Sequence, residues 1–275
     1  MDPFQAVILG MIQGLTEFFP VSSSGHLVIF QQLMGLTEPV LLFDISVHVG
    51  TLAAIVCYYF KDILRLVTAF FQVFPWGKPG SGRAVSPEIL AESRMAWLIV
   101  AGTVPTALIG FGLNTISGIL FSSLLLVGLA LIITGAIVLA TRWARPDPKD
   151  GSAVSLKKAL WIGTVQGLAV IPGISRSGST IAVSLFLGID RDTAARFSFL
   201  LSIPAILGAL VLEIAGGSAG GGHVSAGVIA LGMGTAFVVG YAALSLLVKM
   251  VKKGRLYVFA PYCFLLAAAA LLAGG

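Results

Sequence analysis

Residues 13–26, QGLTEFFPVSSSGH, place a carboxylate, three consecutive hydroxyls and an imidazole in a chain that is otherwise strongly apolar. Residues 166–180, QGLAVIPGISRSGST, repeat much of this pattern and add an arginine. At an offset of 153, residues 10–26 and 163–179 are identical at seven positions, mostly glycine and serine. Each stretch lies between two short apolar segments, so the sequence predicts two copies of one helix–loop–helix unit.

The composition is typical of a membrane protein. Hydrophobic residues make up 57% of the 275 residues, charged residues make up only 11%, and the mean hydropathy is +1.00. Soluble domains carry about 25% charged residues, so this chain has too little polar surface to face water on all sides. The net charge of +5 does not indicate nucleic-acid binding, because aromatic residues do not interleave with a basic patch. The two cysteines lie within apolar runs, which favours buried thiols over a disulfide or a metal pair.

Six apolar runs are long enough to span the hydrocarbon core of a bilayer, which takes about 20 residues. Two further apolar regions, 4–15 and 159–171, are too short to cross at about 1.5 Å per residue. Each is followed by a polar loop and a second short apolar piece, at 27–36 and 180–189, which is the pattern of a re-entrant hairpin. The six predicted spans are 42–60, 94–113, 119–141, 196–216, 224–248 and 256–273.

The basic residues predict how these spans are oriented. Of the 17 Lys and Arg residues, 16 lie near the ends of predicted spans in four clusters, and the alternate connections contain none. Because cytoplasmic loops are enriched in Lys and Arg, the clusters mark the cytoplasmic side. The first re-entrant unit then enters from outside, and the second enters from the cytoplasm. The clusters lie at 61–94, 142–158, 191–196 and 249–255.

Each copy of the polar stretch is followed by three predicted spans. An odd number of spans per copy forces the second copy to be inverted, and inverted repeats bring their interrupted helices together near the midplane. We therefore expect an all-α polytopic membrane protein with six transmembrane helices and two re-entrant helix–loop–helix hairpins in an inverted-topology repeat. Residues 1–275 would form a single membrane domain, with repeat 1 at about 1–145 and repeat 2 at about 155–275.

Arg176 is the one basic residue outside the clusters. A charged side chain at membrane depth is costly, so it marks a candidate functional site. Gly173 and Gly178 flank it, and a short helix is expected to begin at Thr180, where its N-terminus would favour an anion. A guanidinium also binds phosphate oxygens in pairs. This pattern predicts a phosphate-binding cradle, and the alternative is a structural ion pair with Glu17.

Glu17 and His26 are the candidates in the first stretch. A carboxylate and an imidazole around a serine-rich turn suit general acid–base chemistry, activation of a hydroxyl, or binding of a divalent cation. Gln13 lies four residues before Glu17, on the same helical face, and its amide can orient a ligand but cannot act as a base. Taken alone, His26 would be a buried imidazole bonded to the backbone. His48, in the first predicted span, is expected to be a packing residue.

Contact between the two copies would set a carboxylate, an imidazole and hydroxyls against an arginine–hydroxyl cradle. The implied ligand is a phosphorylated group attached to a molecule that resides in the bilayer. Inverted repeats with interrupted helices are equally the architecture of transporters, so a lipid-phosphate flippase or an anion transporter is the alternative function. A carrier needs charge for binding but no nucleophile beside an acid–base pair, and phosphate release in detergent distinguishes the two.

The two motifs resemble those of the undecaprenyl-diphosphate phosphatase family, known also as the bacitracin-resistance proteins. The family pattern E/Q-xxx-E followed by PVSS-S/T-GH is matched by Gln13–Glu17 and by PVSSSGH at 20–26, and PGxSRSG is matched by PGISRSGST at 172–180. The resemblance runs over essentially the whole chain. It implies removal of the terminal phosphate from undecaprenyl diphosphate, a polyprenyl diphosphate lipid. The product is the monophosphate carrier for peptidoglycan and other envelope polymers.

The resemblance also implies roles for individual residues. Glu17, His26 and Arg176 match the core catalytic set. Ser23 matches the serine proposed as nucleophile, and an activated water is the alternative. Ser175 and Thr180 match phosphate-contacting positions. The full set that we expect around the phosphate is Gln13, Ser22, Ser24, Gly25, Ser175, Ser177, Gly178 and Thr180.

Divalent-cation dependence, on magnesium or calcium, is likewise implied by the resemblance, with Glu17 as the candidate ligand. Gln13 stands where some family members have glutamate, so it brings no second negative charge to a metal site. The resemblance implies a bacterial cytoplasmic (inner) membrane, with the site facing the periplasmic or outer side. The sequence leaves the cation's identity and the oligomeric state open, a homodimer included.

Overall fold

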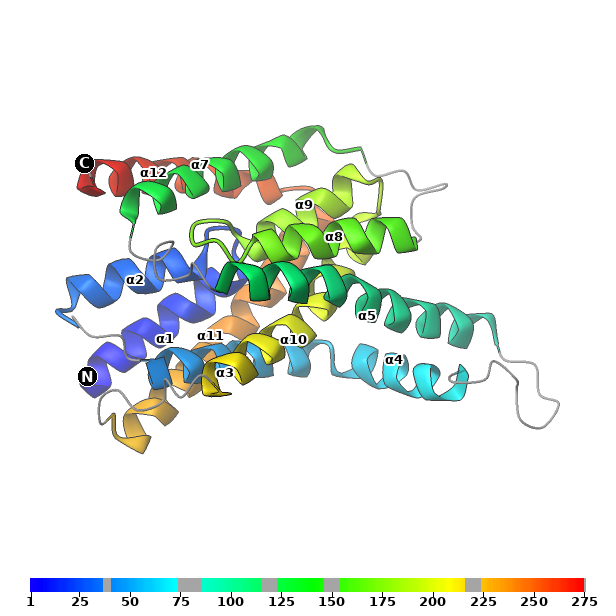
Figure 1. Ribbon diagram of the computed structural model, residues 1–275, viewed down its shortest axis with the longest axis horizontal. Helices are drawn as coiled ribbons and strands as arrows, with labels where there is room; N and C mark the ends of the chain where they lie inside the picture. The colour runs from blue at the N-terminus through cyan, green and yellow to red at the C-terminus, as the bar shows by residue number, and fades with distance from the viewer. Residues whose placement is uncertain (37–40, 74–85, 115–122, 146–153, 216–223, 275) are drawn as a thin grey trace.

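The computed structural model describes residues 1–36, 41–73, 86–114, 123–145, 154–215 and 224–274, and all regular structure within these ranges is helical (Figure 1). The expected all-α class is therefore confirmed. The helices are α1 (Pro3–Phe18), α2 (Ser23–Leu33), α3 (Leu41–Tyr58), α4 (Phe60–Val73), α5 (Pro87–Asn114), α7 (Leu124–Ala140), α8 (Leu156–Leu168), α9 (Arg176–Phe186), α10 (Arg191–Ala215), α11 (Ala226–Lys252) and α12 (Ala260–Gly274), with 3-10 turns η1 (Thr141–Trp143) and η3 (Leu256–Phe259).

Four helices of the described ranges are long and apolar enough to cross a membrane, namely α5, α7, α10 and α11. The helices α3 and α4 make a fifth span only when taken together, because the chain bends by 75° between them. The apolar stretch Leu256–Leu272, which includes most of α12, is shorter than a full span. The structure therefore gives four spans, or five with the bent pair, where the sequence predicted six.

The predicted span 42–60 is interrupted near its C-terminal end. The helix breaks at Tyr59, and α4 continues through residues that were expected to form a connection. Arg196 of α10 binds both Asp62 of α4, at 2.7 Å, and Glu92 of α5, at 2.8 Å. These ion pairs hold the charged start of α4 against two other helices. The charged segment at the start of α4, for which the sequence predicted a connection, is therefore a helix packed against α5 and α10.

Short helix pairs occupy both polar repeats. The helices α1 and α2 are joined by residues 19–22, and α8 and α9 are joined by residues 169–175. Figure 1 shows α1 and α2 extending toward one end of the molecule and α8 and α9 toward the other, with their loops between them. The expected helix–loop–helix pattern is thus present in both copies. Two starts are earlier than predicted, because α2 begins at Ser23 and α9 begins at Arg176.

Glycines at matching positions of the repeats let α1 and α8 approach other helices closely. A Cβ on Gly10 would lie 2.5 Å from the carbonyl oxygen of Gly232 in α11, and one on Gly163 would overlap the carbonyl oxygen of Gly102 in α5. The glycines four residues further along each helix are also crowded. Small residues at this spacing allow close helix packing in membranes. As a result, α1 packs along α11 and α8 packs along α5.

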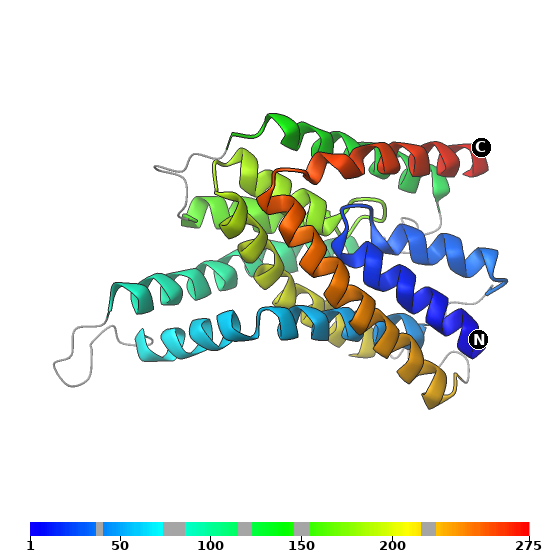
Figure 2. The ribbon, with the colours of Figure 1, turned by 180° about the vertical axis from the view of Figure 1, so that it is seen from behind.

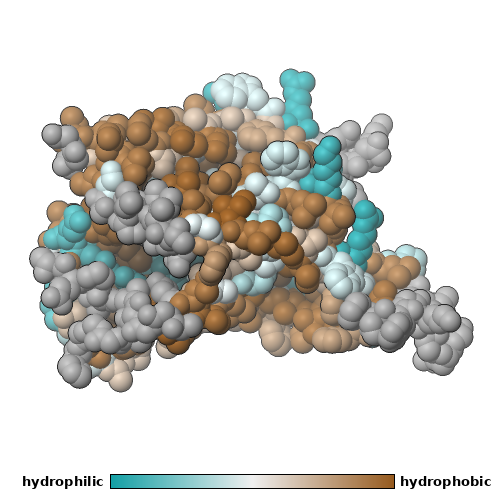
Figure 3. Space-filling model, in the orientation of Figure 1, coloured by the Kyte–Doolittle hydropathy of each residue, from teal (hydrophilic) through white to brown (hydrophobic). Residues whose placement is uncertain are grey.

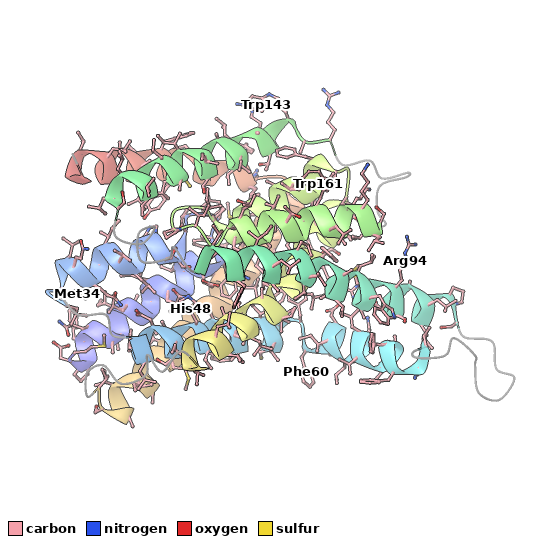
Figure 4. The ribbon with its side chains drawn as sticks, in the orientation of Figure 1. Met34, His48, Phe60, Arg94, Trp143 and Trp161 are labelled. Atoms are coloured by element: carbon pink, nitrogen blue, oxygen red, sulfur yellow. The ribbon has the colours of Figure 1, made fainter. Side chains whose placement is uncertain are left out.

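Apolar side chains cover much of the outside of the molecule. Leu108, Val211 and Leu265 are 71%, 64% and 72% exposed, and the face in Figure 3 is largely hydrophobic. Both chain ends lie toward the same end of the molecule, apart from one another, as Figure 2 shows from behind. Met34 lies at this end and Arg94 lies toward the other (Figure 4). An apolar belt around spanning helices identifies a multi-pass membrane protein.

Candidate functional site

Glu17 lies in the last turn of α1 and accepts hydrogen bonds from both repeats. Its Oε2 accepts from Ser23 Oγ at 2.7 Å and from Gln13 Nε2 at 3.1 Å. Its Oε1 forms an ion pair with Nη2 of Arg176, the first residue of α9. Glu17 and Gln13 are buried, and the Arg176 side chain is 17% exposed. The ion pair considered as the alternative role of Arg176 is therefore present.

The guanidinium of Arg176 has donors beyond this ion pair. Its Nη1 is buried without a hydrogen-bond partner among the described residues, and the same is true of Gln13 Oε1. Buried polar atoms are ordinarily hydrogen-bonded, so an unpaired donor and an unpaired acceptor beside Glu17 indicate a place for a ligand. A phosphate oxygen suits the guanidinium donor. One arginine can thus hold Glu17 with one nitrogen and a phosphate with the other.

The turn between α1 and α2 is strained at Ser22, the non-glycine residue of the described ranges with a positive φ, 69°. Such a conformation costs on the order of 1–3 kcal/mol and persists only where neighbouring contacts hold it. The Gly173 N–H donates to Ser22 Oγ at 3.0 Å, and His26 Nδ1 lies 2.8 Å from the Ser22 carbonyl oxygen. This turn starts α2 at Ser23, which directs the Ser23 hydroxyl at Glu17.

The turn before α9 is held by a threonine of α7. Thr134 Oγ1 donates to the Gly173 carbonyl oxygen at 2.8 Å and accepts from the Ser175 N–H at 3.0 Å. Gly173 has a φ of 93°, and a Cβ there would lie 2.5 Å from the Val127 carbonyl oxygen. Ser175 Oγ accepts from the Gly178 N–H at 3.2 Å and so caps α9. These contacts fix the arginine that begins this helix.

His26 bonds to groups outside the Glu17 cluster. Its Nδ1 is bonded to the Ser22 carbonyl, and its Nε2 lies 2.6 Å from the Tyr262 hydroxyl of α12. The His26 and Tyr262 rings are nearly parallel, at 9°, with centroids 5.7 Å apart. The buried, backbone-bonded imidazole considered for His26 is thus confirmed. Its partner on α12 was not expected.

The serine side chains expected at the phosphate pair within each turn. Ser22 Oγ and Ser24 Oγ are 3.3 Å apart, as are Ser175 Oγ and Ser177 Oγ. Each pair lies at the N-terminus of a short helix, where backbone N–H groups favour an anion. Each serine pair therefore lies where the loop of its hairpin enters the second helix.

Thr180 lies inside α9 and not at its start, contrary to the prediction. Its side chain is fully buried, and its hydroxyl donates to the Arg176 carbonyl oxygen at 2.9 Å. The helix begins one turn earlier because Ser175 caps it. Gly178 supplies the close approach between the hairpins, since a Cβ there would lie 2.8 Å from Pro20 Cβ. Gly25 is buried in the first turn of α2.

Three residues near the site were not identified as functional from the sequence. Thr134 and Tyr262 gave no signal, because a single hydroxyl in an apolar span is usually a packing residue and both contacts join distant parts of the chain. His48 was expected to pack within α3, where Figure 4 labels it. Its Nδ1 is bonded to the Asp44 carbonyl, and the imidazole is close enough to interact electrostatically with Glu17.

The site offers a divalent cation oxygen ligands, but few of them. The described ranges contain no group of three or more His, Cys, Asp or Glu side chains that could hold a metal ion. Both oxygens of Glu17 are hydrogen-bonded, and Gln13 Oε1 is the unpaired oxygen beside them. Magnesium is usually held by one or two carboxylates together with substrate phosphates. The residues therefore fit a cation that arrives with phosphate oxygens.

The fold and the site define a multi-pass helical membrane protein with a buried carboxylate, serine hydroxyl and guanidinium in contact. A family model described as bacitracin resistance protein BacA matches residues 6–269. The chain belongs to this family, so the family resemblance that the two motifs indicated is confirmed.

Curated relatives named undecaprenyl-diphosphatase are similar to the chain over nearly its full length. The relative from Desulfatibacillum aliphaticivorans is 51% identical over 276 residues, which covers 99% of each chain. The relative from Desulfosudis oleivorans is 50% identical over 279 residues, covering 100% of this chain and 99% of that one. The relative from Methanosphaera stadtmanae is 41% identical over 264 residues, covering 96% and 95%.

Proposed function

We propose that this chain is an integral-membrane phosphatase that hydrolyses undecaprenyl diphosphate to undecaprenyl phosphate and inorganic phosphate. Its family and the names of its full-length relatives support this reaction. The structural observation that carries it is the contact of Ser23 and Arg176 with opposite oxygens of Glu17. The reaction recycles the lipid carrier for peptidoglycan and envelope synthesis and would confer bacitracin resistance. A flippase or anion carrier would have no use for a hydroxyl bonded to a buried carboxylate.

The diphosphate binds between the loops of the two hairpins. Arg176 Nη1 donates to a terminal phosphate oxygen, because it is the buried donor without a partner in the described site. The N-terminus of α9 and the serine hydroxyls of both turns add further donors. The prenyl chain extends into the lipid that surrounds the apolar helices. These donors offset the negative charge of the phosphate within the membrane, where bulk water is not present to do this.

Ser23 is positioned to attack the terminal phosphorus. Glu17 accepts the hydrogen bond of the Ser23 hydroxyl and takes its proton as the new oxygen–phosphorus bond forms. The bond from phosphorus to the bridging oxygen breaks, and undecaprenyl phosphate leaves with that oxygen. A water molecule then hydrolyses the phosphoserine and releases inorganic phosphate. Arg176 stabilises the charge that develops on the phosphoryl oxygens, which is the main catalytic contribution in phosphoryl transfer.

A divalent cation, magnesium or calcium, would bind with the diphosphate. Gln13 Oε1 and Glu17 would supply its protein ligands, since the first is unpaired and the second is the carboxylate of the site. When bound, the cation would neutralise negative charge on the phosphate oxygens. Gln13 also donates to Glu17 through its Nε2, so the amide keeps its oxygen turned toward the ligand.

We further infer that the two hairpins are re-entrant parts of an inverted repeat, about 1–145 and 155–275. The crossing of α1 on α11 has its counterpart in the crossing of α8 on α5, each through a glycine of the matched stretch. The hairpins also extend toward opposite ends of the molecule (Figure 1). In the cytoplasmic membrane of a bacterium, the positive-inside rule then opens the first hairpin to the outer face.

Phosphate release from a polyprenyl diphosphate in detergent tests the reaction, because no compartments exist there for transport. We expect activity in the purified protein and a loss of about 100-fold or more on Arg176→Ala. Near wild-type release by Arg176→Ala would refute the role of this arginine. Absence of release by the wild-type protein, with or without added cation, would refute the proposed reaction.

A matched pair of variants tests the nucleophile. Ser23→Ala is expected to abolish the phosphoenzyme, whereas Ser24→Ala removes a neighbouring hydroxyl that bonds Ser22 and leaves the attacking group in place. Rapid denaturation during turnover, followed by mass spectrometry, should reveal a phosphoserine at residue 23. Turnover by Ser23→Ala at the rate of Ser24→Ala would assign the attack to water.

A further inference from the structure

The end of η3 and the start of α12 are docked on the first hairpin. The Phe259 and Phe19 rings lie 5.0 Å apart, and Cys263 Sγ donates to the Pro20 carbonyl oxygen at 3.2 Å. Between these two contacts, Tyr262 bonds His26 Nε2 at 2.6 Å. Three contacts from one stretch therefore hold the segment from Phe19 to His26, which contains the strained turn at Ser22.

The hydrogen bonds of His26 determine which ring nitrogen carries its proton. A backbone carbonyl can only accept, so Nδ1 must be the donor to the Ser22 carbonyl oxygen. In the neutral ring, Nε2 then has no proton and accepts from the Tyr262 hydroxyl. Both bonds are satisfied only by this tautomer. The Ser22 carbonyl thus selects this tautomer, and the Tyr262 hydroxyl, which can donate or accept, donates to Nε2 and fixes the orientation of the ring.

A line of contacts connects Tyr262 to Ser23. The Tyr262 hydroxyl holds the His26 ring, the ring holds the Ser22 carbonyl, and the strained Ser22 residue is followed directly by Ser23 at the start of α2. His26 is 3% exposed, so few other arrangements are open to it. The Tyr262 side chain is 47% exposed on the apolar outside of α12, and its hydroxyl is turned inward to the imidazole.

We propose that Tyr262 is a positioning residue of the phosphatase site: its hydroxyl fixes the orientation of the His26 ring, and through the Ser22 carbonyl it sets the direction of the Ser23 hydroxyl. The inference rests on the proposed phosphatase function. It gives α12, at the far end of the chain, a part in a site that otherwise consists of the two hairpins. Tyr262 makes no contact with the phosphate in this scheme and acts only through His26.

Tyr262→Phe tests this role, because it removes the hydroxyl and keeps the ring that packs beside His26. We expect kcat for phosphate release to fall about 3- to 10-fold, the effect of losing one neutral hydrogen bond, while KM changes less than about 2-fold. Tyr241→Phe in α11 is the matched control, since Tyr241 packs against Tyr58 and not against the site. It should retain wild-type kinetics.

A double-mutant cycle separates positioning from general packing. On a His26→Ala background, Tyr262→Phe should have no further effect on kcat, because the residue through which Tyr262 acts is gone. An equal fold-loss on both backgrounds would overturn the proposal. Wild-type kinetics in Tyr262→Phe would overturn it as well.

Nitrogen-15 NMR of histidine-labelled protein gives a readout that does not depend on turnover. The chain has three histidines, so the His26 resonances can be assigned with a single His26→Ala variant. Tyr262→Phe should shift the Nε2 resonance of His26 and leave the other two imidazoles unchanged. An unchanged His26 spectrum would refute the contact itself. A shifted spectrum in a protein without phosphatase activity would retain the contact and refute the proposed reaction.

Discussion

Gly163 provides a quantitative test of how α8 is seated on α5. A Cβ at this position would overlap the carbonyl oxygen of Gly102, which belongs to the α5 backbone and cannot rotate away. Overpacking costs about 1–3 kcal/mol, and the higher helix propensity of alanine returns about 0.5–1 kcal/mol. Since backbone is the obstacle, we expect Gly163→Ala to lower the free energy of unfolding by about 2 kcal/mol. At about 2–4 °C per kcal/mol, Tm would fall by about 4–8 °C.

The control is Gly234→Ala in α11, where an added Cβ meets nothing within 4 Å. This substitution should leave Tm unchanged or raise it slightly, because only helix propensity changes. Thermal unfolding in detergent can be followed by tryptophan fluorescence, and Trp97 of α5 and Trp161 of α8 report on the two helices concerned. A Gly163→Ala protein that melts at or above the wild-type temperature would refute the close crossing of α8 and α5.

Three further perturbations address the site and its support. Gly173→Ala would place an alanine at a backbone φ of 93° and its Cβ against the Val127 carbonyl oxygen. Phosphate release should therefore fall at least about 10-fold, and release at the wild-type rate would contradict this account of the turn. Chelation of divalent cations should abolish phosphate release, and added magnesium should restore it. Gln13→Glu should lower the cation concentration that gives half-maximal activity. Full activity in the presence of chelator would exclude the cation. Arg196→Gln leaves the carboxylates of Asp62 and Glu92 without their partner, so it should lower Tm while KM for the substrate stays unchanged. An unchanged Tm would show that the ion pairs contribute nothing to stability.

The sequence predicted the parts of the site that depend on local pattern. Two apolar segments too short to span, each followed by a Ser/Gly loop, indicated the hairpins, and the matched copies indicated that Glu17 and Arg176 would meet. The start of α9 was misplaced because capping by Ser175 depends on Thr134 of α7, a contact between residues 41 apart in the chain. No periodic pattern marks such a contact in advance.

Two other features depend on partners that a single segment does not reveal. Tyr262 is one aromatic residue in an apolar run, and its role appears only when His26, 236 residues earlier, is placed beside it. The charges at the start of α4 read as a solvated connection, but Asp62 is paired with Arg196 of α10. In both cases the local sequence was consistent with a simpler interpretation, and tertiary contact decided between them.

The two copies show how a repeated sequence can produce an asymmetric site. At the position of Glu17 the second copy has Val170, and at the position of Ser23 it has Arg176. Two carboxylates meeting between the hairpins would repel each other and the diphosphate, whereas one carboxylate and one guanidinium attract and leave donors for the ligand.

The glutamines at matching positions of the two copies follow the same logic. Gln13 Nε2 bonds Glu17, but Gln166 has no carboxylate one turn away, and its Nε2 donates instead to the Leu201 carbonyl oxygen at 3.1 Å. One copy therefore uses its glutamine in the site and the other uses it to pack α8 against α10. In the proposed mechanism the nucleophile and the base both come from the first hairpin, so attack on the phosphorus comes from that hairpin's side.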